Sequence, residues 1–256
     1  MGNNLGKEKM REKRLLTTMF CAGAFAFALA MTSCGGGGSE SGSGSSSKVN
    51  FQKSPKNEVL GDLVNIAGET RAKIAASNSQ YEEARAKNNE KYADNSDKRE
   101  QNWRKLYQQN EESQKKIVEE AQAAVEKEMA TLNGKSLPYE CEDNLGVEIS
   151  DCKISSVNKP GYDYLTLTFT YKVKASDPAI LKNISPLTYP IKSSFVDANG
   201  NALLDNGGNA VFQTISFNYD MLKQLKNGET IEREGWVKLE PYMANFAKIK
   251  FERNRY

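Results

Sequence analysis

The sequence predicts an α+β chain in which a long N-terminal helix or helical hairpin is followed by an antiparallel β-sandwich. Residues 57–134 contain no proline and are dense in Ala, Glu, Lys, Gln and Asn, a composition that favours helix. After residue 134, apolar residues occupy every second position in several short segments, which is typical of half-buried strands. Asn-Gly and Gly-Gly-Asn turns separate those segments.

Residues 1–33 have the order of a secretory signal. Five basic side chains precede Leu15 to Met31, a run without charge or proline. This run is rich in Ala, Gly and Thr and is slightly short of the about 20 strongly apolar residues that a membrane span needs. We therefore expect a cleaved signal, starting at Met1 or at Met10.

The residues that end this signal resemble the lipobox of bacterial lipoproteins, in which a small residue precedes an acylated cysteine. Here the motif reads Met31-Thr32-Ser33-Cys34. The resemblance implies that Cys34 is lipidated and begins the mature protein, and several acyl chains would hold it to the membrane of the bacterial envelope. Gly35 after the cysteine implies the outer membrane rather than the inner one. The side of that membrane stays open.

Residues 34–56 are expected to form the lipidated start and a flexible tether. Gly35 to Ser47 is almost wholly Gly and Ser, with a reach of ~20 Å.

Residues 57–134 are expected to form a helical stalk or hairpin. Apolar residues recur every seven positions from Leu60 to Tyr81, and aromatic residues every eleven from Tyr81 to Trp103, along a narrow stripe. The best break is at 93–97, where Asn, Ser and Asp can cap a new helix and Glu100 follows Asp97 as in a capping box. A break gives a hairpin with arms of ~55 Å, whereas an unbroken helix gives a rod of about 110 Å. We favour the hairpin, ending at Leu132-Asn133-Gly134.

Residues 135–256 are expected to form the sandwich. Its clearest strand runs from Leu165 to Val173, and a short helix, Tyr219 to Lys226, is capped by Asn218. The strand order, the Asp-x-Asn-Gly-Asn turn at Asp197 and a Leu-x-x-Gly-Glu element at Leu225 resemble the immunoglobulin-like domains of bacterial envelope lipoproteins. That resemblance implies an immunoglobulin-like fold, which serves as a scaffold for many roles.

Composition narrows the function classes. The chain has no histidine, which excludes Ser-His-Asp and Cys-His nucleophile pairs and the commonest zinc ligand sets. Without residues 1–33, the chain has 30 basic and 31 acidic residues, so its charge does not favour a nucleic-acid partner. We expect no cofactor and no enzymatic activity.

Four groups of residues are candidate sites. Cys141 and Cys152 form an even pair in an exported chain, which predicts a disulfide or else two reduced buried thiols. A calcium loop is suggested by Asp197, Asn199, Asn201 and Asp205, although a tight Asn199-Gly200 turn explains the pattern better. Acidic residues around the cysteines could serve glycoside hydrolysis or be solvated surface: Glu140, Glu142, Asp143, Glu148 and Asp151. An aromatic stripe could bind a partner or form a helix seam: Tyr81, Tyr92, Trp103 and Tyr107.

These features predict a non-enzymatic envelope lipoprotein that acts as a scaffold or binding module for protein or glycan, with possible oligomerisation through the helix. One alternative is an adaptor of an envelope transport complex, which a helical hairpin beside a β domain resembles, although no lipoyl-type half-motifs flank the hairpin. Another is a carboxylate-based hydrolase of cell wall or polysaccharide.

The lipid anchor is directly testable. Because acylation requires the Cys34 thiol, Cys34→Ala should abolish metabolic labelling of the protein with palmitate. Labelling that persists in the variant would contradict the anchor, and Cys21→Ala is the matched control, since Cys21 leaves with the signal.

Overall fold

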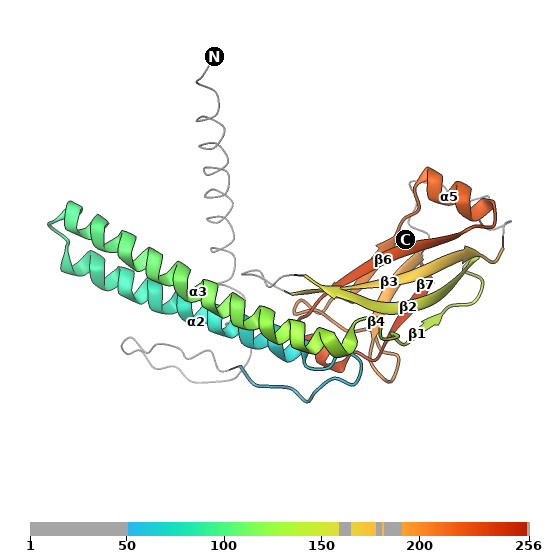
Figure 1. The fold of residues 1–256 in the computed structure, drawn as a ribbon, viewed down its shortest axis with the longest axis horizontal. Helices are drawn as coiled ribbons and strands as arrows, with labels where there is room; N and C mark the ends of the chain where they lie inside the picture. The colour runs from blue at the N-terminus through green and yellow to red at the C-terminus, as the bar shows by residue number, and fades with distance from the viewer. Residues whose placement is uncertain (1–50, 159–164, 178–180, 182–190, 255–256) are drawn as a thin grey trace, which may run out of the picture. The chain divides into compact units, whose positions relative to one another are not determined.

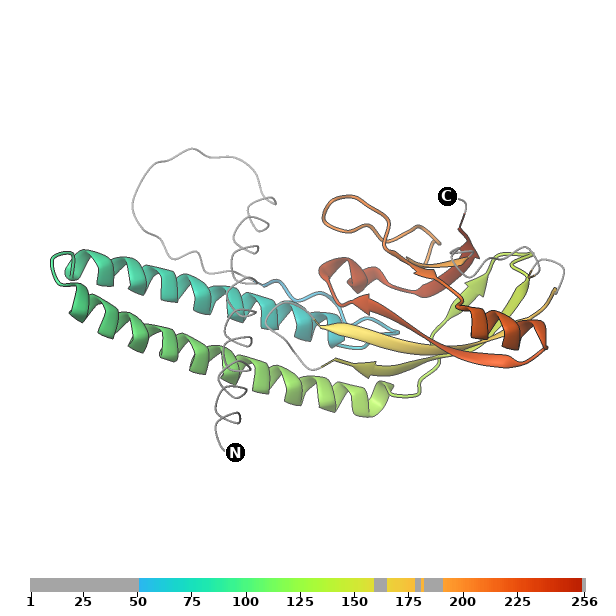
Figure 2. The ribbon, with the colours of Figure 1, turned by 90° about the horizontal axis from the view of Figure 1, so that it is seen from above.

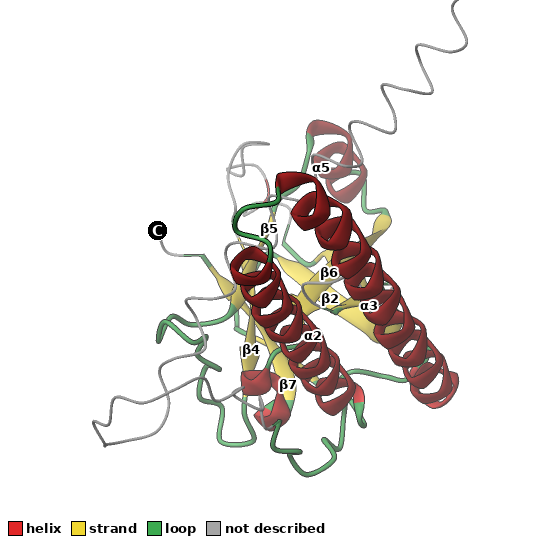
Figure 3. Cartoon of the chain, turned by 90° about the vertical axis from the view of Figure 1, so that its left-hand side faces the viewer, coloured by secondary structure: helices red, strands yellow, loops and turns green. Residues whose placement is uncertain are grey.

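The computed structural model describes residues 51–158, 165–177, 181 and 191–254, so the predicted signal, Cys34 and most of the predicted tether lie outside the described residues. Two long helices precede two packed β-sheets (Figure 1). Helix α2 (Leu63–Lys91) and helix α3 (Ser96–Leu132) lie side by side as an antiparallel hairpin (Figures 2 and 3). The predicted α+β fold with a helical hairpin is confirmed, and the single rod is wrong.

The hairpin turns at the segment that the sequence indicated, and one of the three predicted capping residues caps the second helix. The Asn95 side chain accepts a hydrogen bond from Lys98 N at 3.0 Å, so the cap lies at Asn95 and not at the Asp97 of the predicted capping box. Helix α3 ends where expected, because Gly134 takes a φ of +74° that suits glycine. Of the helices that the structure describes, none combines the length and apolar character needed to cross a bilayer.

The β-sandwich has a three-stranded and a four-stranded layer. The first is antiparallel, in the order β2 (Val147–Val157), β3 (Thr166–Ala175) and β6 (Thr230–Lys238). The second runs β1 (Tyr139–Cys141), β7 (Lys248–Arg253), β4 (Ile191–Val196) and β5 (Phe212–Ile215), antiparallel except for the β1–β7 pair. The two packed, mostly antiparallel layers confirm the predicted sandwich, and β2 pairs with the next strand in the chain, β3. The immunoglobulin-like resemblance of the sequence stays a prediction.

The helix between β5 and β6 follows the predicted signals. Helix α5 (Tyr219–Lys226) has the expected bounds, and its cap, Asn218, accepts from Met221 N at 2.8 Å. A 3₁₀ helix, η1 (Pro241–Asn245), joins β6 to β7.

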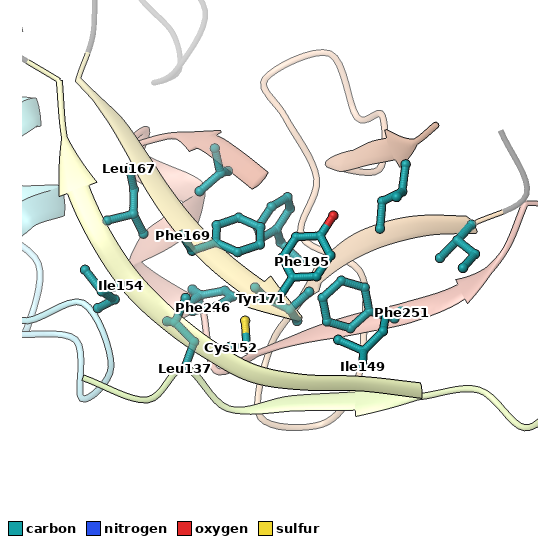
Figure 4. Packing of buried hydrophobic residues seen from close by; sticks show 14 of the residues in the cluster. Leu137, Ile149, Cys152, Ile154, Leu167, Phe169, Tyr171, Phe195, Phe246 and Phe251 are labelled. Carbon is teal, nitrogen blue, oxygen red and sulfur yellow. The ribbon is translucent and has the colours of Figure 1, made fainter. Parts of the chain in front are cut away.

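Aromatic side chains from both layers fill the space between the sheets (Figure 4). Phe169 of β3 meets Phe195 of β4 edge to face, with ring centroids 6.1 Å apart. A Cβ on Gly235 of β6 would lie 2.2 Å from Phe169 Cζ, so only glycine fits beneath this ring. The core continues into the base of the hairpin through Leu60, Leu63 and Val125.

One side chain links the hairpin to the sandwich at this base. Asn57 accepts hydrogen bonds from Val59 N and Leu60 N, at 2.9 and 2.8 Å, and so shapes the turn before α2. Its amide nitrogen donates to Ala244 O and Phe246 O, at 2.9 and 2.8 Å, beside η1. All four hydrogen-bonding positions of this amide are used, two on each side of the joint.

Glu128 of α3 caps the start of α2. Asp62, the N-cap residue of α2, makes no side-chain cap, and Asp62 N donates instead to Glu128 Oε1 at 3.0 Å. Lys56 pairs with the same oxygen at 2.8 Å. Gly61 provides the space for the Glu128 carboxylate, because a Cβ at this position would lie 2.0 Å from Glu128 Oε1. The Lys56 hydrogen bond, followed by the Asp62 N–H, holds the pKa of Glu128 below its ordinary value of 4.5.

This cap predicts a pH-dependent stability. A lowered folded-state pKa gives stability that is present above pH 4.5 and is lost as the pH falls through the folded pKa. Glu128→Gln should therefore lower the free energy of unfolding by ~1 kcal/mol at neutral pH. In urea titrations the difference from wild type should vanish in acid. Glu58→Gln, at an exposed position nearby, is the control, and an equal effect of both variants would contradict the capping role.

Candidate functional site

The inner face of α2 changes in character from the base to the tip. Its buried and half-buried positions are spaced alternately by four and three residues, as in a coiled-coil seam: Leu63, Ala67, Thr70, Ile74, Ser77, Tyr81, Ala84 and Asn88. The base of this seam belongs to the apolar core, whereas Ser77 and Asn88 introduce polar groups farther out. The distal half of the hairpin therefore has little apolar area to hold it.

Side-chain hydrogen bonds join the helices in this distal half. Ser77 Oγ donates to Asn110 Oδ1 at 2.8 Å, and Gln114 Nε2 donates to Asn78 Oδ1 at 2.5 Å. Nearer the tip, Asn88 is only 3% exposed and bonds across the pair. It accepts from Asn102 at 2.7 Å and donates to Arg99 O at 2.9 Å. Because these bonds need specific partners, they define the register of the hairpin more narrowly than apolar contact would.

Three of the four predicted aromatic residues gather beside this polar seam. Tyr81 of α2 meets Tyr107 of α3 edge to face at 6.4 Å, and Trp103 lies 5.9 Å from Tyr107. Trp103 remains 38% exposed. Tyr92 stands apart, because it follows α2 at the turn and contacts Lys91 instead. The eleven-residue spacing through Tyr92 crosses the chain reversal and so does not define one helix face. We call Tyr81, Trp103 and Tyr107 the aromatic cluster.

The predicted disulfide is not formed in this structure, where both cysteines are free. Cys152 of β2 is fully buried and points into the core among Leu137, Ile149 and Tyr171 (Figure 4), whereas Cys141 is exposed on β1. The sequence does not reveal that the two lie in opposite sheets with different environments. Burial raises the pKa of Cys152 to about 12, so this thiol stays protonated at neutral pH.

The calcium candidates form two successive turns of the same design. Asp197 Oδ1 accepts from Asn199 N and Asn201 N, each at 2.9 Å, with Gly200 at a φ of +84°. Asp205 Oδ1 accepts likewise from Gly207 N and Asn209 N, at 2.8 and 2.9 Å. These N–H groups lower the pKa of both carboxyls. The carboxylates thus serve the turns, and no group of three His, Cys, Asp or Glu residues within the described part of the chain could hold a metal ion.

The acidic residues near the cysteines are engaged with other parts of the sandwich. Glu140 pairs with Lys248, and Glu142 accepts from Arg253 N at 2.8 Å. Asp151, on the other sheet, pairs with Lys172 at 2.6 Å. Asp143 and Glu148 are exposed. A glycosidase pair must instead face one substrate bond, so this arrangement does not favour hydrolysis.

Two features escaped the sequence analysis. The polar seam could have been found by extending the alternating four-and-three spacing past Ile74, which selects Ser77 and Asn88. The second feature is Trp236 of β6, which is 51% exposed. Strand alternation could have placed it outward, because Gly235 and Val237 are both buried.

Asn88 provides a test of the polar seam. Asn88→Ala removes both hydrogen bonds and leaves Arg99 O without its side-chain donor, which should destabilise the tip locally by about 1–3 kcal/mol. Hydrogen exchange should then be at least several-fold faster around residues 85–102, with little change in the sandwich. Asn89→Ala, at the exposed neighbouring position, is the matched control. Unchanged exchange at the tip would contradict this role.

No protein-family model, curated protein or solved structure matches the chain. Its function is therefore inferred from its own residues.

Proposed function

We propose that this protein is a lipid-anchored, non-enzymatic lipoprotein of the bacterial envelope whose helical hairpin binds a protein partner. The anchor rests on the signal and on the lipobox resemblance at Cys34. The binding role rests on the aromatic cluster of the hairpin.

The exposure of Trp103 is the observation that carries the binding role. Trp103 keeps 38% of its surface exposed beside the half-buried Tyr81 and Tyr107, so part of its ring is accessible to a partner. Tryptophan and tyrosine are enriched among the residues that dominate protein interfaces. Rings already packed on one another would lose little conformational entropy on binding.

The joint at the sandwich supports the same role. The Asn57 amide and the shared core attach the hairpin to the sandwich, so the cluster is held on a defined support rather than on a free helix. Isolated helical hairpins with few apolar contacts are marginal in water. The sandwich then acts as the scaffold and the tether as the spacer from the membrane.

Crosslinking in the native envelope tests this function. A lysine-reactive reagent can act at Lys98 and Lys105, which flank Trp103 on α3. One envelope protein should be recovered reproducibly with wild type, and its yield should fall about tenfold or more in Trp103→Ala, as expected for loss of a central aromatic contact.

The matched control is Trp236→Ala, which changes the other tryptophan of the chain and should leave this crosslink intact. Equal loss in both variants, or a crosslink that survives Trp103→Ala, would contradict the hairpin as the contact surface. Recovery of an inner-membrane transporter would favour the adaptor function.

A further inference from the structure

The outer face of the three-stranded sheet carries a second exposed aromatic surface, separate from the hairpin cluster. Trp236 projects from β6 and is 51% exposed. Within the described residues, none of the other large exposed apolar side chains belongs to β2, β3 or β6. The residues around Trp236 therefore indicate which kind of ligand this exposed ring could contact.

The backbone at Trp236 is held from both sides. Trp236 pairs with Thr168 of the neighbouring strand β3. On its open edge, Trp236 N donates to Gln213 Oε1 of β5 at 3.0 Å, which ties the two sheets together at this corner. Because the backbone is fixed in this way, only the side-chain torsions of Trp236 would have to be ordered on binding.

On the side of the neighbouring strands, hydroxyl-bearing residues lie next to Trp236 on the same face. The register places Thr166, Thr168 and Thr170 of β3 opposite Lys238, Trp236 and Glu234 of β6. Across the sheet, Ser156 of β2 faces Thr168. A row across the three strands therefore consists of Trp236, Thr168 and Ser156. The hydroxyl groups of Thr168 and Ser156 can each donate and accept a hydrogen bond.

The charges on this face cancel. Its outward positions carry four carboxylates and four ammonium groups: Glu148, Asp151, Glu232 and Glu234 with Lys153, Lys172, Lys174 and Lys238. Several are paired, since Asp151 lies 2.6 Å from Lys172 and 3.7 Å from Lys153. A face with this balance complements a ligand that carries no net charge, and it disfavours nucleic acid or anionic lipid.

The small apolar area and the hydroxyl groups of this face favour a sugar ligand over a protein partner. A stable protein interface buries about 800 Å² on each side around an apolar centre, and one ring among hydroxyls and paired charges falls short of that. A pyranose ring instead has an apolar face of C–H groups that stacks on an indole, with hydroxyls around its rim that bond to Thr, Ser and carboxylate groups.

We propose that the outer face of the β2–β3–β6 sheet, centred on Trp236, binds a neutral polysaccharide. The indole of Trp236 stacks on one sugar ring, and Thr168, Ser156 and Glu234 hydrogen-bond the hydroxyls of that ring or the next. This site lies on the sandwich and does not depend on the hairpin function.

Affinity electrophoresis of the full-length protein in detergent tests the proposal. The probes are mannan, β-glucan, galactan and xylan, with polygalacturonate as the anionic comparison. At least one neutral polysaccharide should retard the wild-type protein. Trp236→Ala should raise the apparent Kd about tenfold or more, and Trp236→Tyr, which keeps a ring, should retain part of the affinity. Thr168→Val should weaken binding several-fold, whereas Trp103→Ala should leave it unchanged.

Fluorescence supplies a second readout, because the chain has only two tryptophans. In Trp103→Phe, Trp236 is the sole indole, and its emission should shift on addition of the retarding polysaccharide. Circular dichroism checks that each variant is folded. The proposal is overturned by no retardation with any neutral probe, by retardation that survives Trp236→Ala, or by preference for polygalacturonate. Protein crosslinks lost in Trp236→Ala but not in Trp103→Ala would also overturn it, by assigning the face to a protein.

Discussion

The arrangement of the described chain depends on one joint, where the Asn57 side chain connects the start of the hairpin to the end of the sandwich. Its oxygen organises the turn that leads into α2, and its nitrogen binds two carbonyls beside η1, nearly 190 residues away in the sequence. A side chain with a single donor or acceptor could not serve both sides. Leu60 and Leu63, directly after this turn, then bury completely in the core that the two parts share.

From this joint outward, the forces that hold the hairpin change. Near the base, apolar side chains of both helices pack into the common core, and Glu128 of α3 caps α2. Farther out, Ser77, Asn78 and Asn88 replace apolar contacts with directional hydrogen bonds. Directional bonds specify register but contribute less net stability than burial of large apolar groups. The hairpin thus combines an apolar base with an outer half that directional hydrogen bonds hold in register and that carries the aromatic cluster.

The two tryptophans lie on separate supports and in different surroundings. Trp103 stands on a helix next to two tyrosines, which suits contact with an apolar protein surface. Trp236 stands on a sheet among threonines and balanced charges, which suits a neutral ligand rich in hydroxyls. The proposed membrane anchor and the two proposed binding surfaces would together allow the protein to hold an envelope protein close to a polysaccharide.

Features that depend on local chemistry can be predicted from the sequence. These are the signal and lipobox pattern, the helical and strand segments, the reversal near Asn95, the α5 cap at Asn218 and the Asp197 turn. Each follows from the backbone preferences of a few neighbouring residues. Features that depend on residues far apart in the chain became visible in the folded protein. It placed Tyr81 against Tyr107 but not beside Tyr92, put Cys141 and Cys152 in opposite sheets, and joined Asn57 to Ala244. The reason is physical: residue spacing fixes the face of an element on which a side chain lies, whereas its neighbours depend on how the elements pack.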